Sequence, residues 1–547
     1  MRPTALPFVF LLAAVLPAQA QISVDLAPYT VLAGIDRSGV PDVTAAPFDA
    51  SAVAAMDAQR AAEGKLPYYS RFQSVNAGLY GAGQWRMLPN GDRLWRLRVV
   101  SPGAIATELY FDEFELPPGA TMHVYDDAGA ETLGAFTDRN NHESGLFTTA
   151  LVSGEASTVE YYEPAIVAGA GHIHIDQVGH AYRMVGSMKS DDCEVDVRCT
   201  PEGDDWTLQK DGVVRLSVVD PNGAGWCSGS VVDNTAHDFK PYILTAFHCG
   251  VASTAANFTQ WKAYFRYEKP NCGSGSALGN KVMTGCVKRA DSNDGGGNSG
   301  SDFLLIEMDD QIPGNFFPYW NGWDASGSAS TGGVGIHHPA GSQKAISTYT
   351  VTTTSASWGI SGTHWRVVWA PTTNGWGVTE GGSSGSPLFN SDGLIMGTLT
   401  GGTSYCESVM PGGNNDPDFY GKLSYHWDSN PGPASEYLGA WLDPVGGGTT
   451  LTNGGLVGVA EHYDASGPDL YPNPAVDRVT AIYPLGVTMV DRIDVLDISG
   501  RLIRSIVPLT TMQADIDTEG LNSGTYFVKL VTGDDPRPAV QLTVIRD

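Results

Sequence analysis

The segment CSGSVVDNTAHDFKPYILTAFHC, residues 227–249, decides the fold of the central part of this chain. It reads as two strands joined by a polar loop, and the apolar run Tyr242–Leu244 is predicted to be a buried strand. His248 follows that strand, so its imidazole should emerge at the end of the core. The chain has 12 histidines, and most histidines are structural or exposed, so a catalytic role for His248 needs support from further residues.

The sequence GGSSGSP at 381–387 supplies a candidate nucleophile, Ser384. Glycines on both sides allow a serine to sit in a tight turn with its hydroxyl exposed. The N–H groups of Gly382 and Ser384 would then face the negative charge that develops on an attacked carbonyl oxygen. The other interpretation is an ordinary surface loop rich in glycine and serine, of which this chain has many.

A candidate acid, Asp302, stands directly before the apolar run Phe303–Ile306. A carboxylate at the entrance to a core strand can fix the tautomer of a histidine, or it can simply cap a turn. Four other acids compete for this role, namely Asp291, Asp294, Asp309 and Asp310. A calcium loop at 291–294 is a weaker interpretation, because no bidentate glutamate follows at the usual spacing. We expect no metal and no cofactor.

Together these residues favour a serine endopeptidase. The order His248, Asp302, Ser384 is that of the chymotrypsin type and differs from the order in subtilisins and α/β-hydrolases. That order disfavours a lipase or esterase. A protease-like adhesin or binding protein with an inactive site is the alternative from another class, and labelling of Ser384 by a fluorophosphonate would discriminate the two.

The first twenty residues have the features of a secretory signal peptide. Arg2 provides positive charge, Phe8–Leu16 the apolar stretch, and Ala18–Ala20 the cleavage site. All seven cysteines lie between Cys193 and Cys406, and secretion makes disulfides plausible there. The net charge of −28 argues against a nucleic-acid partner, because phosphate binding requires basic surfaces. We expect a monomer that is secreted, extracellular or at the cell surface, with protein or peptide substrates.

Composition divides the chain into five parts. They are the signal peptide 1–20, a β-rich region 21–189, a cysteine-rich domain 190–444, a linker 445–467 rich in glycine and threonine, and a C-terminal module 468–547. Short strands between turn residues predict β structure in the three folded parts, with a β-sandwich in the last. Short helices are predicted around 51–63 and 437–441.

The cysteine-rich domain resembles the bacterial lysyl endopeptidases of the trypsin-like serine protease family. The matching stretches are CEVDVRC, the segment 227–249, SDFLLIEM, GIHHP, SGTHW, GVTEGGSSGSP, and DFYGKLSYHW followed by WLDP. The resemblance covers about residues 190–444 and includes cysteines and loops besides the triad. It implies an all-β, chymotrypsin-like double β-barrel with the active site between the barrels.

The same resemblance implies three disulfides, Cys193–Cys406, Cys199–Cys272 and Cys227–Cys249. Cys286 is then left over, which departs from the family pattern. It is either a buried free thiol or the partner of Cys272 in a competing assignment.

The resemblance also implies a pocket for the lysine side chain. Trypsin places an aspartate six positions before its nucleophile, and here that position is Val378. Asp418 in DFYGK matches the pocket acid of the lysyl endopeptidases, with Asp416 as a nearby rival. The expected pocket wall comprises Gly401, Gly402, Trp358, and Thr400 where the family has a histidine. We therefore expect cleavage after lysine, with broader Lys/Arg specificity as the alternative.

The flanking parts carry resemblances of their own. The last module resembles a type IX secretion sorting domain through LYPNPAVD, VLDISGRLI and LNSGTYFVKL, which implies the type IX secretion machinery as a partner. The N-terminal region resembles the propeptide of such proteases. Ser383 stands where trypsin has the aspartate that binds a new N-terminus, so we expect activation by propeptide removal. The expected cut is Lys189–Ser190, with Arg183 as the alternative site.

Overall fold

A computed structural model describes most of the chain from residue 26 to residue 546. Residues within this range that it leaves undescribed are 63, 64, 66, 184–191, 276, 278–280, 407–412, 457–467, 472–474, 483–489, 491, 499, 508–512 and 532–538. The chain divides into two units, Met1–Gly455 and Leu456–Asp547. The expected signal peptide and the expected Lys189–Ser190 cut both fall outside the described residues.

The N-terminal region consists of two groups of strands packed around one core. The first group is β1 (Asp42–Thr44), β3 (Gln84–Met87), β4 (Arg93–Val100), β6 (Thr121–Tyr125), β7 (Thr132–Phe136) and β10 (Ala156–Glu163). The second is β2 (Tyr68–Gly78), β5 (Ala106–Glu115), β8 (Phe147–Thr148), β9 (Val152–Ser153) and β11 (His172–Ala181). Helices α1 (Tyr29–Leu32) and α2 (Ala50–Ala62) precede β2, and α2 confirms the helix predicted there.

The first sheet of the cysteine-rich domain carries His248 and Asp302. Its strands are β12 (Val213–Asp220), β13 (Gly223–Val231), β14 (Tyr242–Thr245), β15 (Lys262–Phe265), β16 (Lys281–Thr284), β17 (Cys286–Asp291) and β18 (Leu304–Met308). Every residue of β12 and β13 is buried, because both faces of these strands are covered. The short helix α3 (Gln209–Gly212) precedes β12, and α4 (Phe247–Gly250) and α5 (Ala255–Phe258) lie between β14 and β15.

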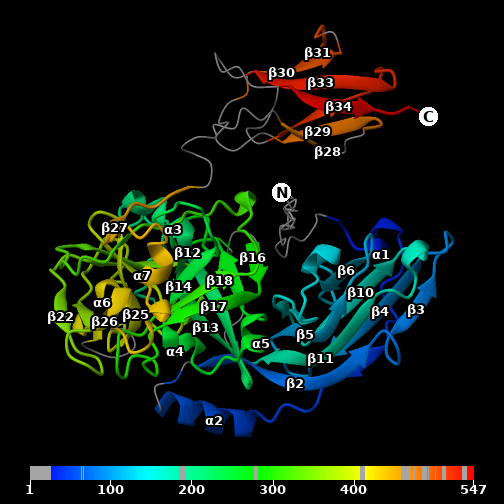
Figure 1. Ribbon diagram of the computed structural model, residues 1–547. Helices are drawn as coiled ribbons and strands as arrows, with labels where there is room; N and C mark the ends of the chain where they lie inside the picture. The colour runs from blue at the N-terminus through cyan, green and yellow to red at the C-terminus, as the bar shows by residue number, and fades with distance from the viewer. Residues whose placement is uncertain are drawn as a thin grey trace, which may run out of the picture. The chain divides into compact units, whose positions relative to one another are not determined.

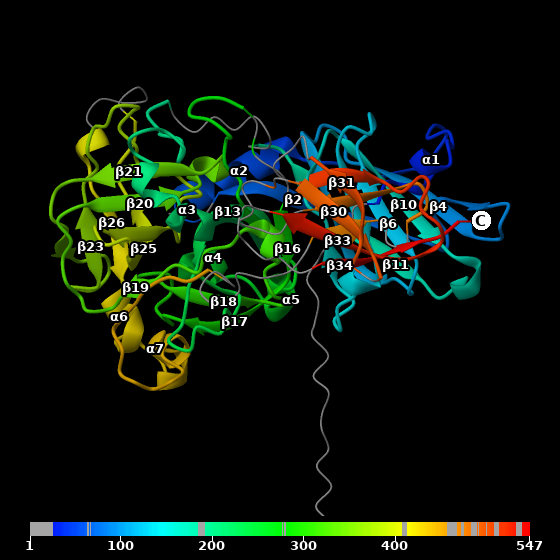
Figure 2. The same ribbon diagram turned by 90° about the horizontal axis from the view of Figure 1, so that it is seen from above.

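The second sheet of this domain runs in the order β21-β20-β24-β25-β26-β23-β22, with β19 and β27 at the side. The strands are β19 (Trp323–Asp324), β20 (Gly333–His337), β21 (Ala345–Tyr349), β22 (Thr354–Ala356), β23 (His364–Val367), β24 (Pro387–Asn390), β25 (Ile395–Gly402), β26 (Asp418–Lys422) and β27 (Leu451–Thr452). Helices α6 (Leu423–Asp428) and α7 (Gly439–Leu442) follow β26. The two sheets lie side by side (Figure 2) and share a core that includes Leu244 and Ile395, which agrees with the predicted all-β double barrel.

The N-terminal region and the first barrel form one continuous sheet, which the sequence did not predict. Strand β2 pairs antiparallel with β13, so the strand order runs β16-β15-β12-β13-β2-β11-β5-β8 (Figure 1). The N-terminal region is therefore attached to the domain through backbone hydrogen bonds as well as side chains.

The C-terminal unit contains two small sheets around a core of its own, as the predicted β-sandwich requires. Its strands are β28 (Asp469–Tyr471), β29 (Arg478–Ile482), β30 (Arg492–Asp497), β31 (Leu502–Ile506), β32 (Gln513–Asp517), β33 (Gly524–Val531) and β34 (Val540–Val544). The buried side chains include Val479, Ile493 and Val528. No helix among the described residues is long and apolar enough to cross a membrane.

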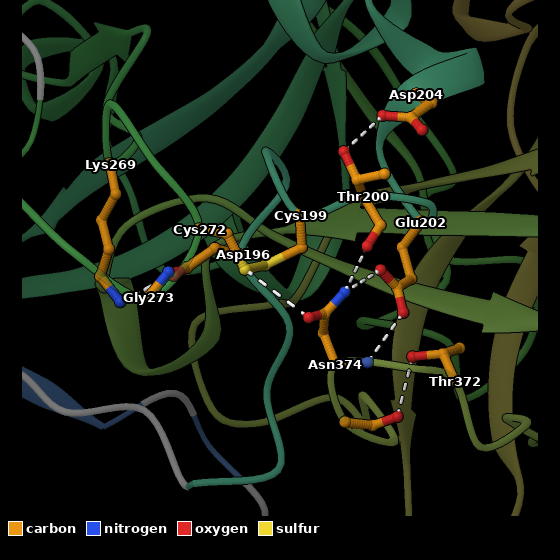
Figure 3. Close-up of a disulfide and its surroundings, with 11 residues drawn as sticks. Asp196, Cys199, Thr200, Glu202, Asp204, Lys269, Cys272, Gly273, Thr372 and Asn374 are labelled. Atoms are coloured by element: carbon orange, nitrogen blue, oxygen red, sulfur yellow. Dashed lines mark hydrogen bonds and ion pairs between the residues drawn. A yellow bond between two sulfur atoms is a disulfide. The ribbon is translucent and has the colours of Figure 1, made fainter.

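Three disulfides cross-link the cysteine-rich domain, and their pairing is the one that the resemblance implies. They are Cys193–Cys406, Cys199–Cys272 and Cys227–Cys249. Cys286 is a buried free thiol. Beside Cys199–Cys272, the side-chain amide of Asn374 donates to Glu202 and to the carbonyl of Thr200 (Figure 3). The start of the domain is thus held against a loop of the second barrel.

Candidate active site

His248 and Asp302 meet because the strands that carry them are paired. Thr245 at the end of β14 lies opposite Leu304 at the start of β18. His248 follows the first strand and Asp302 precedes the second, so both side chains reach the same end of the sheet. Nδ1 of His248 lies 2.7 Å from Oδ2 of Asp302, and the backbone N–H of His248 donates to Oδ1 over 2.9 Å.

The backbone at Asp302 is held in an unusual conformation. Its φ of 61° lies in the left-handed region that non-glycine residues rarely adopt. The N–H of Asp302 donates to Oδ2 of Asp294 over 2.8 Å, and Oδ1 of Asp294 accepts the N–H groups of Gly296 and Gly297 over 3.0 Å each. Asp294 therefore orients Asp302. Among the described residues, no group of three metal-ligating side chains lies together.

The two partners shift each other's pKa values in opposite directions. Burial alone would lower the pKa of His248, but the charge and hydrogen bond of Asp302 outweigh it and raise the pKa above 6.5. Burial alone would raise the pKa of Asp302, but the interactions with His248 outweigh it and lower that pKa. Asp302 is therefore an anion at neutral pH, and it stabilises a positive charge on the imidazole.

The backbone of Ser384 contacts strand β13 and Cys249, the residue after His248. The N–H of Ser228 on β13 donates to the carbonyl of Ser384 over 2.8 Å, and Sγ of Cys249 lies 3.9 Å from that carbonyl oxygen. Within the described residues, no hydrogen bond joins Oγ of Ser384 to Nε2 of His248. Such bonds are often long in unliganded enzymes and tighten when substrate binds.

The nucleophile loop leaves three backbone donors unused. The N–H groups of Ser383, Gly385 and Ser386 donate to backbone carbonyls. Those of Gly381, Gly382 and Ser384 donate to no described residue. Gly382 has φ of 103°, and a Cβ there would lie 2.7 Å from the backbone nitrogen of Gly341, so only glycine fits. Two of these three free donors, those of Gly382 and Ser384, are the pair that the sequence predicts as an oxyanion hole.

Asp418 is a fully buried carboxylate on β26. Its Oδ2 accepts hydrogen bonds from Nε1 of Trp369 over 2.6 Å, Oγ1 of Thr379 over 2.8 Å and Oγ of Ser404 over 2.7 Å. Val378 occupies the sequence position of the trypsin pocket aspartate, and Thr379 is the next residue. The carboxylate of Asp418, on β26, therefore lies close to that position. Burial raises the pKa of Asp418, although the three donors oppose that rise. The rival Asp416 is partly exposed.

Glycine is required where the chain passes Asp418. A Cβ on Gly402 would lie 1.8 Å from Oδ1 of Asp418. A Cβ on Gly401 would lie 3.3 Å from the indole of Trp358. A side chain at either position would therefore crowd the Asp418 carboxylate or the Trp358 indole.

The sequence did not predict a role for His364, a buried residue on β23. Its Nε2 lies 2.9 Å from Oγ1 of Thr400, and its ring centroid lies 6.1 Å from that of Trp358. The hydroxyl of Thr400 in turn lowers the pKa of Asp302 through a hydrogen bond. An imidazole thus stands beside Trp358 after all, on β23, which β26 separates from β25 and its Thr400. The motif SGTHW contains it, but sequence spacing could not show that β23 borders the site.

Ser383 takes part in a buried hydrogen-bond network of neutral groups. Its Oγ lies 2.7 Å from Nδ1 of His337, whose Nε2 lies 2.9 Å from Oγ of Ser347. Burial lowers the pKa of His337 to about 3, so this imidazole is neutral. The buried carboxylate of Glu194 also lies near this network, with its Oε2 3.8 Å from Nε2 of His337.

Comparison with known proteins assigns two parts of the chain. Residues 187–421 match the family model described as lysyl endopeptidase, C-terminal domain, and residues 469–540 match that of the secretion system C-terminal sorting domain. Solved structures with detectable similarity include the protease Anisep from Arthrobacter nicotinovorans (16% identity, TM-score 0.29, covering 39% of this chain and 91% of that one). Another is the serine endoprotease from Yersinia pestis (16% identity, TM-score 0.26, covering 41% and 64%). The sorting domain indicates export, which confirms the predicted localisation.

Proposed function

We propose that this chain, which carries a lysyl endopeptidase domain and a secretion sorting domain, is an exported serine endopeptidase that cleaves after lysine. The observation that carries the proposal is the convergence of three features: the His248–Asp302 pair, the free N–H groups of Gly382 and Ser384, and the buried carboxylate of Asp418.

The chemistry follows from these groups. Ser384 attacks the scissile carbonyl while Nε2 of His248 takes its proton, and Asp302 holds the imidazole with Nδ1 protonated. The N–H groups of Gly382 and Ser384 stabilise the oxyanion. His248 returns the proton to the leaving amine, and water then hydrolyses the acyl-enzyme by the same steps in reverse.

The hydrogen bonds of Asp418 favour lysine over arginine. Oδ2 already accepts three hydrogen bonds, whereas Oδ1 accepts one described bond, from the N–H of Ser404 over 3.3 Å. An ammonium group is a compact donor that one oxygen can bind. A guanidinium fork binds best to two free oxygens, so broader Lys/Arg specificity is the second choice.

Activation by propeptide removal is part of the proposal. Ser383 itself offers no carboxylate to a new N-terminal ammonium, and its hydroxyl contacts neutral His337. Cleavage after Lys189, with Arg183 as the alternative, would separate the N-terminal region from the domain. N-terminal sequencing of the mature protein tests the position of this cut.

The nucleophile is tested with Ser384→Ala. The variant should fold as the wild type does but lose nearly all peptidase activity and all labelling by a fluorophosphonate. Ser386→Ala is the matched control, because Ser386 is a buried neighbour outside the proposed triad. Wild-type turnover by Ser384→Ala would refute the assignment.

The pocket acid is tested with Asp418→Asn, and Asp416→Asn is its control. Asp418→Asn should lose its preference for lysine over phenylalanine in kcat/KM, because a buried ammonium without a partner is costly. Asp416→Asn should keep the preference. Mass spectrometry of the products formed from Lys, Arg and Phe peptides measures the preference of both variants. An unchanged preference in Asp418→Asn would assign the pocket to another residue.

A further inference from the structure

The strand β2 of the N-terminal region adds to β13 directly beside the nucleophile loop. Arg71, Ser70 and Tyr68 pair with Gly223, Ala224 and Gly225. Strand β13 then continues through Trp226 to Ser228, whose N–H donates to the carbonyl of Ser384. The pairing therefore brings β2 to the edge of the proposed active site.

Residues before this pairing lie against the oxyanion hole. A ring carbon of Pro67 lies 3.5 Å from the position of a Cβ on Gly381. Residues from both segments line one small cavity, namely Pro67, Tyr68, Tyr69, Trp226, Ala340, Gly381 and Gly382. If a bound peptide had its scissile carbonyl at Gly382, the residues that follow the scissile bond would meet Pro67.

Tyr69 anchors the segment. Its ring stacks on Trp226 with a centroid separation of 4.1 Å and an interplanar angle of 14°. Its hydroxyl lies 2.7 Å from Oγ of Ser217 and 3.2 Å from both carboxylate oxygens of Glu108. Tyr69 is 1% exposed, so the contact is dry and charge-assisted.

The covered surface lies on the leaving-group side of the scissile bond. The proposed lysine pocket, with Asp418 and Gly402, belongs to β25 and β26 of the second barrel. Trp226 belongs to β13 of the first barrel, which bonds to the Ser384 carbonyl through Ser228, whereas β25 bonds to the next residue, Gly385, through Leu399. A substrate with its lysine at Asp418 must therefore continue past Gly382 onto β13, where it would add as a strand as β2 does.

We propose that residues 67–71 occupy the surface that binds the leaving-group side of a peptide substrate, with Tyr69 on Trp226 as the anchor. The attached N-terminal region thus excludes polypeptides while leaving the lysine pocket open. This inference rests on the proposed function. Lys65 stands two residues before Pro67, so a chain cut after Lys65 would keep Pro67 to Arg71 in the position of a retained product.

The test compares two substrates on the intact full-length protein and on the processed protein without its N-terminal region. One is a lysine methyl ester, which has almost nothing beyond the scissile bond. The other is a peptide that continues for several residues after its lysine. Mass spectrometry before and after each assay verifies that the full-length chain stays intact.

We expect the intact chain to hydrolyse the ester, and its ratio of peptide to ester kcat/KM to be lower than that of the processed enzyme by roughly tenfold or more. Tyr69→Ala should raise this ratio in the intact chain. Tyr80→Ala is the matched control, because this tyrosine of the same region is 76% exposed, and it should change nothing.

Equal ratios for the intact and processed proteins would overturn the inference. So would an intact chain that rejects the ester and the peptide equally, since that requires the whole site to be covered. A processed protein that hydrolyses neither substrate and is not labelled at Ser384 would instead refute the proposed function, and the inference with it.

Discussion

Two carboxylates of the site show how their partners set the charge of individual residues. Asp302 faces the imidazole of His248, which becomes positive in the proposed mechanism, and the pKa of Asp302 is lowered. Asp418 faces only neutral donors in the described chain, and burial raises its pKa. Asp302 is therefore an anion before any substrate binds, whereas a substrate lysine bound at Asp418, as we propose, would favour ionisation of that carboxylate.

The raised pKa of His248 predicts the acid limb of the pH profile. Only neutral imidazole acts as the base, so kcat/KM for a lysine ester should fall as the pH falls through a value above 6.5. Asp302→Asn should lower kcat by about 10⁴-fold, because the imidazole loses its orienting anion. An acid limb below 6.5 in the wild type would contradict the contribution of Asp302.

Gly382→Ala should damage the oxyanion hole specifically. A Cβ would lie 2.7 Å from the nitrogen of Gly341 at a φ of 103°, so the loop must shift. We expect kcat to fall by about 10²–10³-fold, the loss typical of one missing oxyanion donor. Gly381→Ala is the control, since its Cβ meets nothing closer than Pro67 at 3.5 Å. Equal effects of both variants on kcat would show that Gly382 has no special role.

At the scale of the element, the geometry of the site depends on the residues at the ends of paired strands. The pairing of β14 with β18 brings His248 to Asp302, and the disulfide Cys227–Cys249 ties β13 to the histidine turn α4. Strand β13 also binds the nucleophile loop through Ser228. A change in this one strand is therefore transmitted to all three proposed catalytic residues.

Removal of the Cys227–Cys249 disulfide should destabilise the protein measurably. The cysteines are 22 residues apart, and a bridge of that span contributes about 3 kcal/mol to the free energy of unfolding. We expect a loss of that order for the variant with both cysteines replaced by serine, measured by urea unfolding in a Ser384→Ala background. Cys199→Ser with Cys272→Ser, a longer span of 73 residues, should lose at least as much. A loss below 1 kcal/mol for either pair would contradict this account.

At the scale of the whole molecule, the N-terminal region is attached through a buried ion pair as well as through a strand. Nζ of Lys262 on β15 lies 2.9 Å from Oε2 of Glu108 on β5, and both side chains are fully buried. The hydroxyls of Tyr69 and Tyr110 also donate to Glu108. Release of the region therefore separates a buried cation from its only described carboxylate partner and exposes it to water.

Lys262→Met should destabilise the full chain by about 3–5 kcal/mol, because it leaves Glu108 buried without its cation. The combined variant with Glu108→Gln should recover much of that loss. Lys269→Met is the control, since its pairing with Asp196 is partly exposed and should be worth about 1 kcal/mol or less. Urea unfolding of the Ser384→Ala protein measures all three. If Lys262→Met destabilised the processed protein to the same extent, the Lys262–Glu108 pair would not be what holds the N-terminal region.

The sequence by itself determined the candidate chemistry and the class of fold. Local patterns were enough to predict the chemistry and the fold class, because a buried strand, a glycine-flanked serine and a signal for export can each be recognised from a short stretch of sequence. The helix at Ala50–Ala62 and the C-terminal module were predicted in the same way.

Only the tertiary structure decided which distant groups meet. The sequence left Asp294 as an alternative acid of the triad, and the structure shows that it orients Asp302 instead. His364 lies at the site on a strand whose position could not be predicted from sequence spacing. The stacking of Tyr69 on Trp226 joins residues more than 150 positions apart. Such contacts depend on strand register and on burial across separate segments, and sequence periodicity contains neither, because it reports only which face of its own element a side chain occupies.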